Sequence, residues 1–201
     1  MNDSKKIILF DIGGVLIEYG DVFQTVAREQ NFAHELIDST FDKYDREITT
    51  GKITPQELYL KCLSENNLEA DKEYNFVTSW ISDYETIRPT YDLVQELMEI
   101  YEVGFLSNIY KGMVEEMISQ KVLPHIEEKY RFLSCDIGMQ KPDVELYDFV
   151  DEKLNLNKGE LLFVDDKNEN FPPALERGWE VFEFPRKNPE EGARKLKELL
   201  L

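Results

Sequence analysis

The stretch that decides the fold is Lys5–Leu16, KKIILFDIGGVL, in which an apolar run ends at Asp11 and two glycines follow. The apolar residues before Asp11 predict a short buried β-strand. Glycine lets bare backbone approach a ligand closely, and ligands of open parallel sheets bind beyond the carboxyl ends of the strands. The stretch therefore predicts a strand that places Asp11 at a ligand site on the edge of a sheet.

A second apolar run, Leu161–Val164, also ends in acidic residues, Asp165 and Asp166. If both strands lie in one parallel sheet, three carboxylates meet at the same edge. Carboxylates packed together repel one another unless a cation lies between them, and Mg²⁺ takes oxygen ligands of this kind. We therefore expect Mg²⁺ as the cofactor of this acidic group.

The composition narrows the possible partners. The chain has 201 residues and a net charge of -18, which argues against nucleic acids and anionic membranes because both are polyanions. Cys62 and Cys135 are too few and too far apart for a disulfide framework or a zinc site. The first residues show no signal peptide, and no apolar run is long enough to span a bilayer. We expect a cytoplasmic protein without a nucleic-acid or membrane partner.

Two kinds of pattern divide the chain. From Ile17 to Arg88 nearly all the periodicity is helical, and Thr54-Pro55-Gln56-Glu57 is a capping box that starts one of the helices. After Pro89, strand-like runs alternate with helical ones. The five strands of the predicted sheet are residues 7–10, 103–106, 130–134, 161–164 and 179–184.

The alternation of strands and helices predicts an α/β fold with a parallel sheet and right-handed crossovers. We expect a Rossmann-like three-layer core whose five-stranded parallel sheet has the order 3-2-1-4-5, with the Asp11 strand central. The core is expected to comprise residues 1–16 and 89–201, and residues 17–88 to form an inserted helical cap.

Other polar residues fall at the ends of the predicted core strands. Ser107 and Asn108 follow the second strand, and Lys141 precedes a helix after the third. A carboxylate nucleophile, neutral and cationic groups that hold oxygens, and a metal site are the parts of a phosphoryl-transfer site. We predict Asp11 and Lys141 as catalytic residues, and Ser107, Asn108 and Lys141 as substrate-binding residues.

Taken in chain order, these motifs resemble those of the haloacid dehalogenase-like superfamily of hydrolases, over essentially the whole length. FDIGGVL (10–16), LSN (106–108) and GMQKP (138–142) look most like the branch of sugar-phosphate phosphatases similar to glucose-1-phosphatase. The resemblance implies a Mg²⁺-dependent phosphatase of a small phosphorylated metabolite, with sugar phosphates among the candidate substrates. The 17–88 insertion looks like the family's helical cap of the first type.

The resemblance also implies roles for individual residues. Asp11 attacks phosphorus and becomes an aspartyl phosphate, which water then hydrolyses. Asp11, the backbone carbonyl of Gly13, and Asp166 hold Mg²⁺, and Asp165 supports the metal directly or through water.

The chain departs from the family pattern at Gly13, where typical phosphatases of the family carry a second aspartate as general acid and base. Because positioned acid–base catalysis contributes about 10²–10⁴-fold, we expect slow turnover or a strong dependence on the leaving group. Glu18 and Asp21 are the nearest acids downstream that could substitute. The change Gly13→Asp is expected to restore part of the missing function if the loop accepts a side chain.

Two other function classes remain open. The same Asp11 nucleophile could displace halide from a 2-haloacid, a reaction that needs neither a metal nor a proton for the leaving group. Asp165 and Asp166 would then be an unexplained anionic pair beside an anionic substrate. Alternatively, the loss at Gly13 could leave a non-catalytic binding protein. The partner expected from the leading interpretation is a small-molecule phosphate ester.

Overall fold

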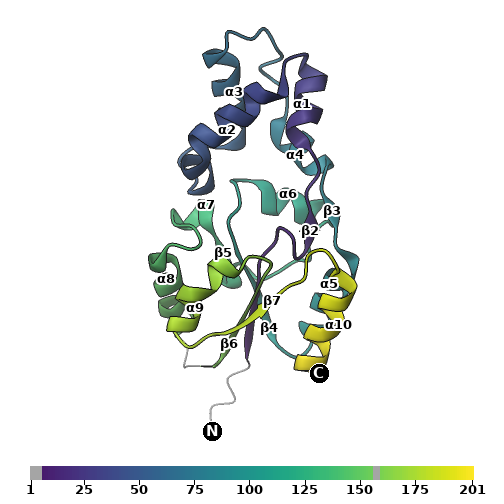
Figure 1. Ribbon diagram of the computed structural model, residues 1–201, viewed down its shortest axis with the longest axis vertical. Coiled ribbons are helices and arrows are strands. Elements are labelled where there is room, and N and C mark those ends of the chain that lie inside the picture. The colour runs from purple at the N-terminus through teal and green to yellow at the C-terminus, as the bar shows by residue number, and fades with distance from the viewer. Residues whose placement is uncertain (1–5, 156–158) are drawn as a thin grey trace.

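Strand β1 (Ile7–Phe10) lies at the centre of a five-stranded parallel sheet in the computed structural model, which describes residues 6–155 and 159–201 (Figure 1). The sheet order is β5-β4-β1-β6-β7, which confirms the predicted α/β fold and the predicted order 3-2-1-4-5. Residues 1–5, which the predicted core includes, lie outside the described residues. The other strands are β4 (Glu102–Ser107), β5 (Arg131–Leu133), β6 (Leu161–Asp165) and β7 (Glu180–Glu183).

Different helices cover the two faces of the sheet. Successive side chains of β1 point to opposite faces and therefore contact different helices. Ile8 and Phe10 belong to a hydrophobic cluster with side chains of α5, α6 and α10. Ile7 and Leu9 belong to a second cluster with side chains of α8 and α9, and Figure 1 shows these helix groups on opposite sides of the sheet. The helices span α5 (Arg88–Leu97), α6 (Met113–Ser119), α8 (Val144–Leu154), α9 (Phe171–Glu176) and α10 (Pro189–Leu200).

The strand register brings the ends of β1, β4 and β6 to one edge of the sheet. Phe10 pairs with Val164 on one side and with Phe105 on the other. The backbone N–H of Asp11 donates to the carbonyl of Val164 at 2.8 Å, so Asp11 lies beside the strand end that carries Asp165. The order of the strands thus gathers residues from distant parts of the chain at this edge.

Four helices form a helical layer beyond this edge, at the top of Figure 1. The predicted capping box is confirmed at the start of one of them: Thr54 Oγ1 accepts from the Glu57 N–H at 3.2 Å, and the Glu57 carboxylate accepts from the Thr54 N–H at 2.7 Å. The members of the helical layer are α1 (Val22–Gln30), α2 (His34–Thr49), α3 (Pro55–Glu65) and α4 (Phe76–Ser82).

The chain enters and leaves the helical layer through two short antiparallel strands, β2 (Ile17–Glu18) and β3 (Glu85–Thr86). These strands were not predicted, because two residues are too few for the period-two alternation that identifies a strand. Within the part of the chain that the structure describes, no helix has the length and apolar character needed to cross a membrane. The remaining short helices are α7 (Ser134–Ile137), η1 (Glu128–Tyr130) and η2 (Asn168–Asn170).

Candidate active site

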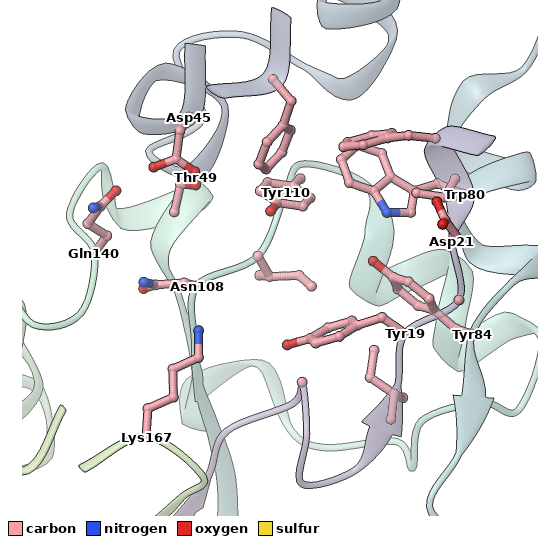
Figure 2. Close-up of a pocket in the computed structure, with 17 residues that line it drawn as sticks. Tyr19, Asp21, Asp45, Thr49, Trp80, Tyr84, Asn108, Tyr110, Gln140 and Lys167 are labelled. Carbon is pink, nitrogen blue, oxygen red and sulfur yellow. The ribbon is translucent and has the colours of Figure 1, made fainter. Parts of the chain in front are cut away.

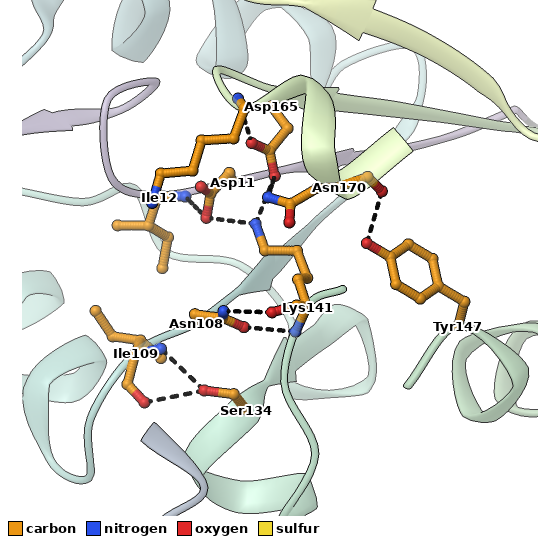
Figure 3. A network of polar contacts seen from close by, with 10 residues as sticks. Asp11, Ile12, Asn108, Ile109, Ser134, Lys141, Tyr147, Asp165 and Asn170 are labelled. Carbon is orange, nitrogen blue, oxygen red and sulfur yellow. Dashed lines mark hydrogen bonds and ion pairs between the residues drawn. The ribbon is translucent and has the colours of Figure 1, made fainter. Parts of the chain in front are cut away.

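Lys141 bridges the carboxylates of two neighbouring strand ends (Figure 3). Its Nζ lies 3.0 Å from Asp11 Oδ1 and 2.6 Å from Asp165 Oδ2, and all three residues are buried. Burial by itself lowers the pKa of Lys141, but the two carboxylates outweigh it and raise that pKa above its ordinary value. The side chain is therefore a buried cation in contact with the predicted nucleophile.

Asp11 is held from several directions. Its Oδ1 accepts a hydrogen bond from the Ile12 N–H at 2.8 Å, and the buried Ser107 hydroxyl lowers the pKa of its carboxyl. Burial raises the pKa of Asp11, while Lys141 lowers it and Asp165 raises it further, with a net upward shift. The side chain is thus oriented by its neighbours in an environment where added positive charge would stabilise the ionised form.

Asp165 is fully engaged by the protein. Besides Lys141, its Oδ2 accepts from Asn170 Nδ2 at 2.9 Å and its Oδ1 accepts from the Lys167 N–H at 2.8 Å. Asn170 is fixed in turn, because its carbonyl accepts from the Tyr147 hydroxyl at 2.7 Å (Figure 3). These hydrogen bonds fix the Asp165 carboxylate in a position where it holds the Lys141 amine.

Asp166 differs from its neighbour because one of its buried oxygens, Oδ1, has no hydrogen-bond partner in the described part of the chain. Burial raises the pKa of Asp166, and the charges of Asp11 and Asp165 raise it further. Ligand atoms of the three aspartates lie within 4.8 Å of one another. An unpartnered buried carboxylate oxygen is costly, and a divalent cation among these oxygens would satisfy it, so the donor set fits Mg²⁺.

The side-chain amide of Asn108 contacts the backbone of Lys141. Its Nδ2 donates to the Lys141 carbonyl at 2.9 Å, and its Oδ1 accepts from the Lys141 N–H at 2.8 Å. Both ends of the amide are therefore used to hold the Lys141 backbone (Figure 3). Positioning of the lysine is the contact that the structure provides, and binding of substrate by Asn108 stays a prediction.

The two glycines after Asp11 serve different purposes. Gly14 has a φ of +74°, and a Cβ there would lie 2.3 Å from Asp166 Oδ2, so this position requires both glycine's backbone freedom and its lack of a side chain. At Gly13 a Cβ would lie 1.7 Å from the Tyr19 hydroxyl oxygen. Tyr19 thus fills the space in which the family's second aspartate would begin, and Gly13→Asp requires Tyr19 to move.

Both acids predicted as replacements have partners in the structure. The Glu18 carboxylate pairs with the Arg186 guanidinium, and this hydrogen bond is the main reason why the pKa of Glu18 is lowered. Asp21 caps α1, accepting from the Gln24 N–H at 3.2 Å. Arg186 also lies 3.9 Å from Asp166 and stacks over the Tyr19 ring, with its guanidinium carbon 4.9 Å from the centroid.

Two cavities open onto this site. The smaller one, about 70 Å³, is lined by Asp11 and Lys141, and we call it the Asp11 cavity. The larger one, about 480 Å³, lies between the sheet edge and the helical layer (Figure 2), and we call it the aromatic cavity. Tyr19, Asn108 and Lys167 line both cavities, so the two are neighbours. Tyr19, Lys167 and Arg186 could not be predicted as site residues, because none of them belongs to a motif.

Reactive groups at the carboxyl ends of parallel strands, below an added helical layer, place the chain among the α/β proteins whose ligands bind beyond the strand ends. A family model narrows this class further. The model described as haloacid dehalogenase-like hydrolase matches residues 5–175, so the chain belongs to that family and the family resemblance of the motifs is confirmed.

Two characterised relatives are phosphatases. The D-ribitol-5-phosphate phosphatase of Bacteroides thetaiotaomicron is 28% identical over 210 residues, covering 96% of each chain. A sesquiterpene phosphatase of Aspergillus oryzae is 26% identical over 173 residues, covering 85% of each chain. The names of these relatives thus span a sugar alcohol phosphate and a terpenoid phosphate.

Solved structures agree in fold. The family enzyme BT-2542 of Bacteroides thetaiotaomicron is 23% identical with a TM-score of 0.74, covering 92% of this chain and 95% of that one. Its complex with magnesium and inorganic phosphate gives a TM-score of 0.72 at 24% identity, covering 91% of this chain and 96% of that one. Magnesium and inorganic phosphate are thus ligands of that neighbour.

Proposed function

We propose that this hydrolase is a Mg²⁺-dependent phosphatase of a small phosphate monoester, with Asp11 as nucleophile and residues 17–88 acting as a cap over the core. The observation that carries the proposal is the pairing of a buried Asp11–Lys141 contact with the unpartnered oxygen of Asp166. The lysine offers positive charge to a phosphate, and the aspartates offer ligands to a cation. The phosphatase relatives support the same reaction class.

In the first step an oxygen of Asp11 forms a bond to phosphorus and the bond from phosphorus to the ester oxygen breaks. Both electrons of that bond go to the ester oxygen, which takes a proton from water and leaves as the alcohol. Lys141 and the Ser107 hydroxyl would hold the non-bridging oxygens. Bound Mg²⁺, held by Asp11, Asp166 and the Gly13 carbonyl, would neutralise negative charge on the phosphate.

In the second step the hydroxide left from that water attacks the phosphorus of the aspartyl phosphate. The bond between the Asp11 oxygen and phosphorus breaks, Asp11 regains its carboxylate and inorganic phosphate leaves. Lys141 stays beside Asp11 throughout, because Asp165 and Asn108 hold its amine and its backbone.

The dehalogenase alternative explains fewer of these contacts. A 2-haloacid would bring a carboxylate next to the acidic pair, and the reaction would give no use to the unpartnered Asp166 oxygen. Repulsion between the carboxylate of the haloacid and the carboxylates of Asp165 and Asp166 would disfavour binding.

The proposal is tested by phosphate release from acetyl phosphate and p-nitrophenyl phosphate, with Mg²⁺ and with EDTA. Mg²⁺-dependent release that Asp11→Asn abolishes is the expected result. Activity that survives EDTA, or halide release from 2-chloropropionate without phosphate release, would overturn it. No phosphate release from either compound in the presence of Mg²⁺ would favour the non-catalytic alternative.

A further inference from the structure

One wall of the aromatic cavity is built from rings that different elements contribute (Figure 2). Phe23 of α1, Phe41 of α2 and Trp80 of α4 all line it. Tyr110, which follows β4, joins them with its ring 4.9 Å from that of Trp80 and 5.8 Å from that of Phe41. The rings support one another through edge and tilted contacts, so this wall is a rigid apolar surface.

The charges around the aromatic cavity are arranged unevenly. The carboxylates of Asp21 and Asp45 line it. Lys167 is the one lysine or arginine among the lining residues that the structure describes, and it also lines the Asp11 cavity. A phosphate beside Asp11 would have Lys141 and Lys167 near it, whereas an anionic group farther into the aromatic cavity would meet two carboxylates.

We propose, on the basis of the proposed phosphatase function, that the substrate is the monophosphate of an uncharged, largely apolar alcohol whose flat hydrocarbon portion lies against the aromatic wall. A cavity of about 480 Å³ is within the range of sites that enclose a small-molecule ligand, roughly 300–1,000 Å³. An apolar portion of the substrate would contact the ring faces, whereas a second phosphate or a carboxylate would lie beside Asp21 and Asp45.

The first test compares wild-type kcat/KM for benzyl phosphate and ribitol 5-phosphate, which both release an alcohol. Burial of a ring predicts a preference for benzyl phosphate of about 10- to 100-fold. Equal or better use of ribitol 5-phosphate would overturn the substrate class. Acetyl phosphate, which has no bulky leaving group, separates the two proposals: its turnover keeps the phosphatase proposal standing, and its failure with Mg²⁺ overturns both.

The second test concerns charge and compares kcat/KM for 4-carboxybenzyl phosphate with kcat/KM for benzyl phosphate. The added carboxylate should lower kcat/KM by about 10-fold or more, since like charges disfavour binding. Asp45→Asn should narrow this ratio, while Asp42→Asn, on the same helix but outside the lining, should leave the ratio at its wild-type value. An unchanged ratio in Asp45→Asn would contradict the role of the acidic lining.

A different observation carries a second inference, about Tyr19. Its hydroxyl oxygen would be 1.7 Å from a Cβ at Gly13, and its side chain lines both cavities. The oxygen that joins phosphorus to the alcohol has to lie where the Asp11 cavity and the aromatic cavity meet. We infer that the Tyr19 hydroxyl donates a hydrogen bond to this ester oxygen as negative charge develops on it.

The test of this inference is Tyr19→Phe, assayed with benzyl phosphate and with acetyl phosphate. Loss of a donor to a developing oxyanion should lower kcat for benzyl phosphate by about 10²-fold. The loss for acetyl phosphate should be much smaller, because acetate is a stable leaving group. The remote Tyr91→Phe should not change the ratio of the two rates. Equal losses on both substrates in Tyr19→Phe would mean a structural role and would overturn the inference.

Discussion

The strand-end site and the aromatic cavity lie next to each other but are built in opposite ways. At the strand ends, Lys141, Asp165 and Asn108 are buried or held by several hydrogen bonds each. In the aromatic cavity, ring faces and several polar side chains, most of them exposed, leave about 480 Å³ of open space. A reaction common to many substrates requires fixed geometry, whereas recognition of one alcohol requires a shaped space. Changes in the first region should therefore affect every substrate, and changes in the second should depend on the alcohol.

The largest effect is expected from Asp11→Asn. Because the amide is a poor nucleophile and has no charge to pair with Lys141, kcat should fall by at least about 10³-fold. The loss should be the same for acetyl phosphate and benzyl phosphate, which steady-state phosphate release would measure. A loss that differs strongly between the two substrates would contradict the separation of the two regions.

The next effect is expected from Asp166→Asn. The variant keeps the size of the side chain but removes the negative charge of the carboxylate, whose Oδ1 has no hydrogen-bond partner in the described part of the chain. Mg²⁺ should therefore bind at least about 10-fold more weakly. Isothermal titration with Mg²⁺ measures this without reference to activity. Asp92→Asn, on the surface of α5, is the matched control. Unchanged affinity in Asp166→Asn would rule out this aspartate as a ligand.

A smaller effect, at the boundary between the regions, is expected from Gly13→Asp. The new side chain would overlap the Tyr19 hydroxyl, so the single variant should lose about 10-fold in kcat with benzyl phosphate. In a Tyr19→Ala background the space is open, and Gly13→Asp should then raise kcat relative to Tyr19→Ala alone. Kinetics of all four proteins form the cycle that measures this coupling. Additive effects would mean that the two positions do not compete for space.

The smallest effect is expected from Glu18→Gln, which breaks the pair with Arg186. The Glu18 side chain is 43% exposed, so the melting temperature at pH 7 should fall by no more than about 2 °C. The folded-state pKa of Glu18 is lowered, so the pair stabilises the protein above the pKa of the unfolded chain and loses this contribution as pH falls through the folded-state value. Thermal unfolding of wild type and variant should therefore converge in acid. A large fall in kcat instead would indicate that Glu18 is the proton donor after all.

Much of the sheet could be predicted because several of its strands end in a recognisable group. The run before Asp11, the acidic pair at the end of β6 and the lysine before α8 each indicated both an element and its end, and the sheet order agreed. The ribbon of β2 and β3 could not be predicted, because two residues carry no periodicity. The capping box at Thr54 could be predicted, because its two reciprocal hydrogen bonds lie within four consecutive residues.

The roles of the site residues could be predicted only in part, because they depend on packing between distant segments. Asp165 and Asp166 look equivalent in the sequence, yet one is satisfied by three donors and the other has an unpartnered oxygen. Their difference arises from which strand or loop lies opposite, and that is a property of packing. Tyr19 lies beside Gly13 because the chain turns between Ile12 and Ile17, where the Gly14 N–H donates to the Ile17 carbonyl at 2.8 Å. No local sequence pattern indicates this turn.

The ribbon of β2 and β3 has a consequence for engineering. The chain passes into the helical layer and back out through two paired strands, with Ile17 opposite Thr86. The two junctions are therefore neighbours, and the intervening segment can be exchanged as a cassette without cutting a strand of the large sheet. A chimera that joins this core to the corresponding segment of a relative would replace Phe23, Phe41 and Trp80 of the aromatic wall together with Tyr19, and would leave Asp11 and Lys141 in place.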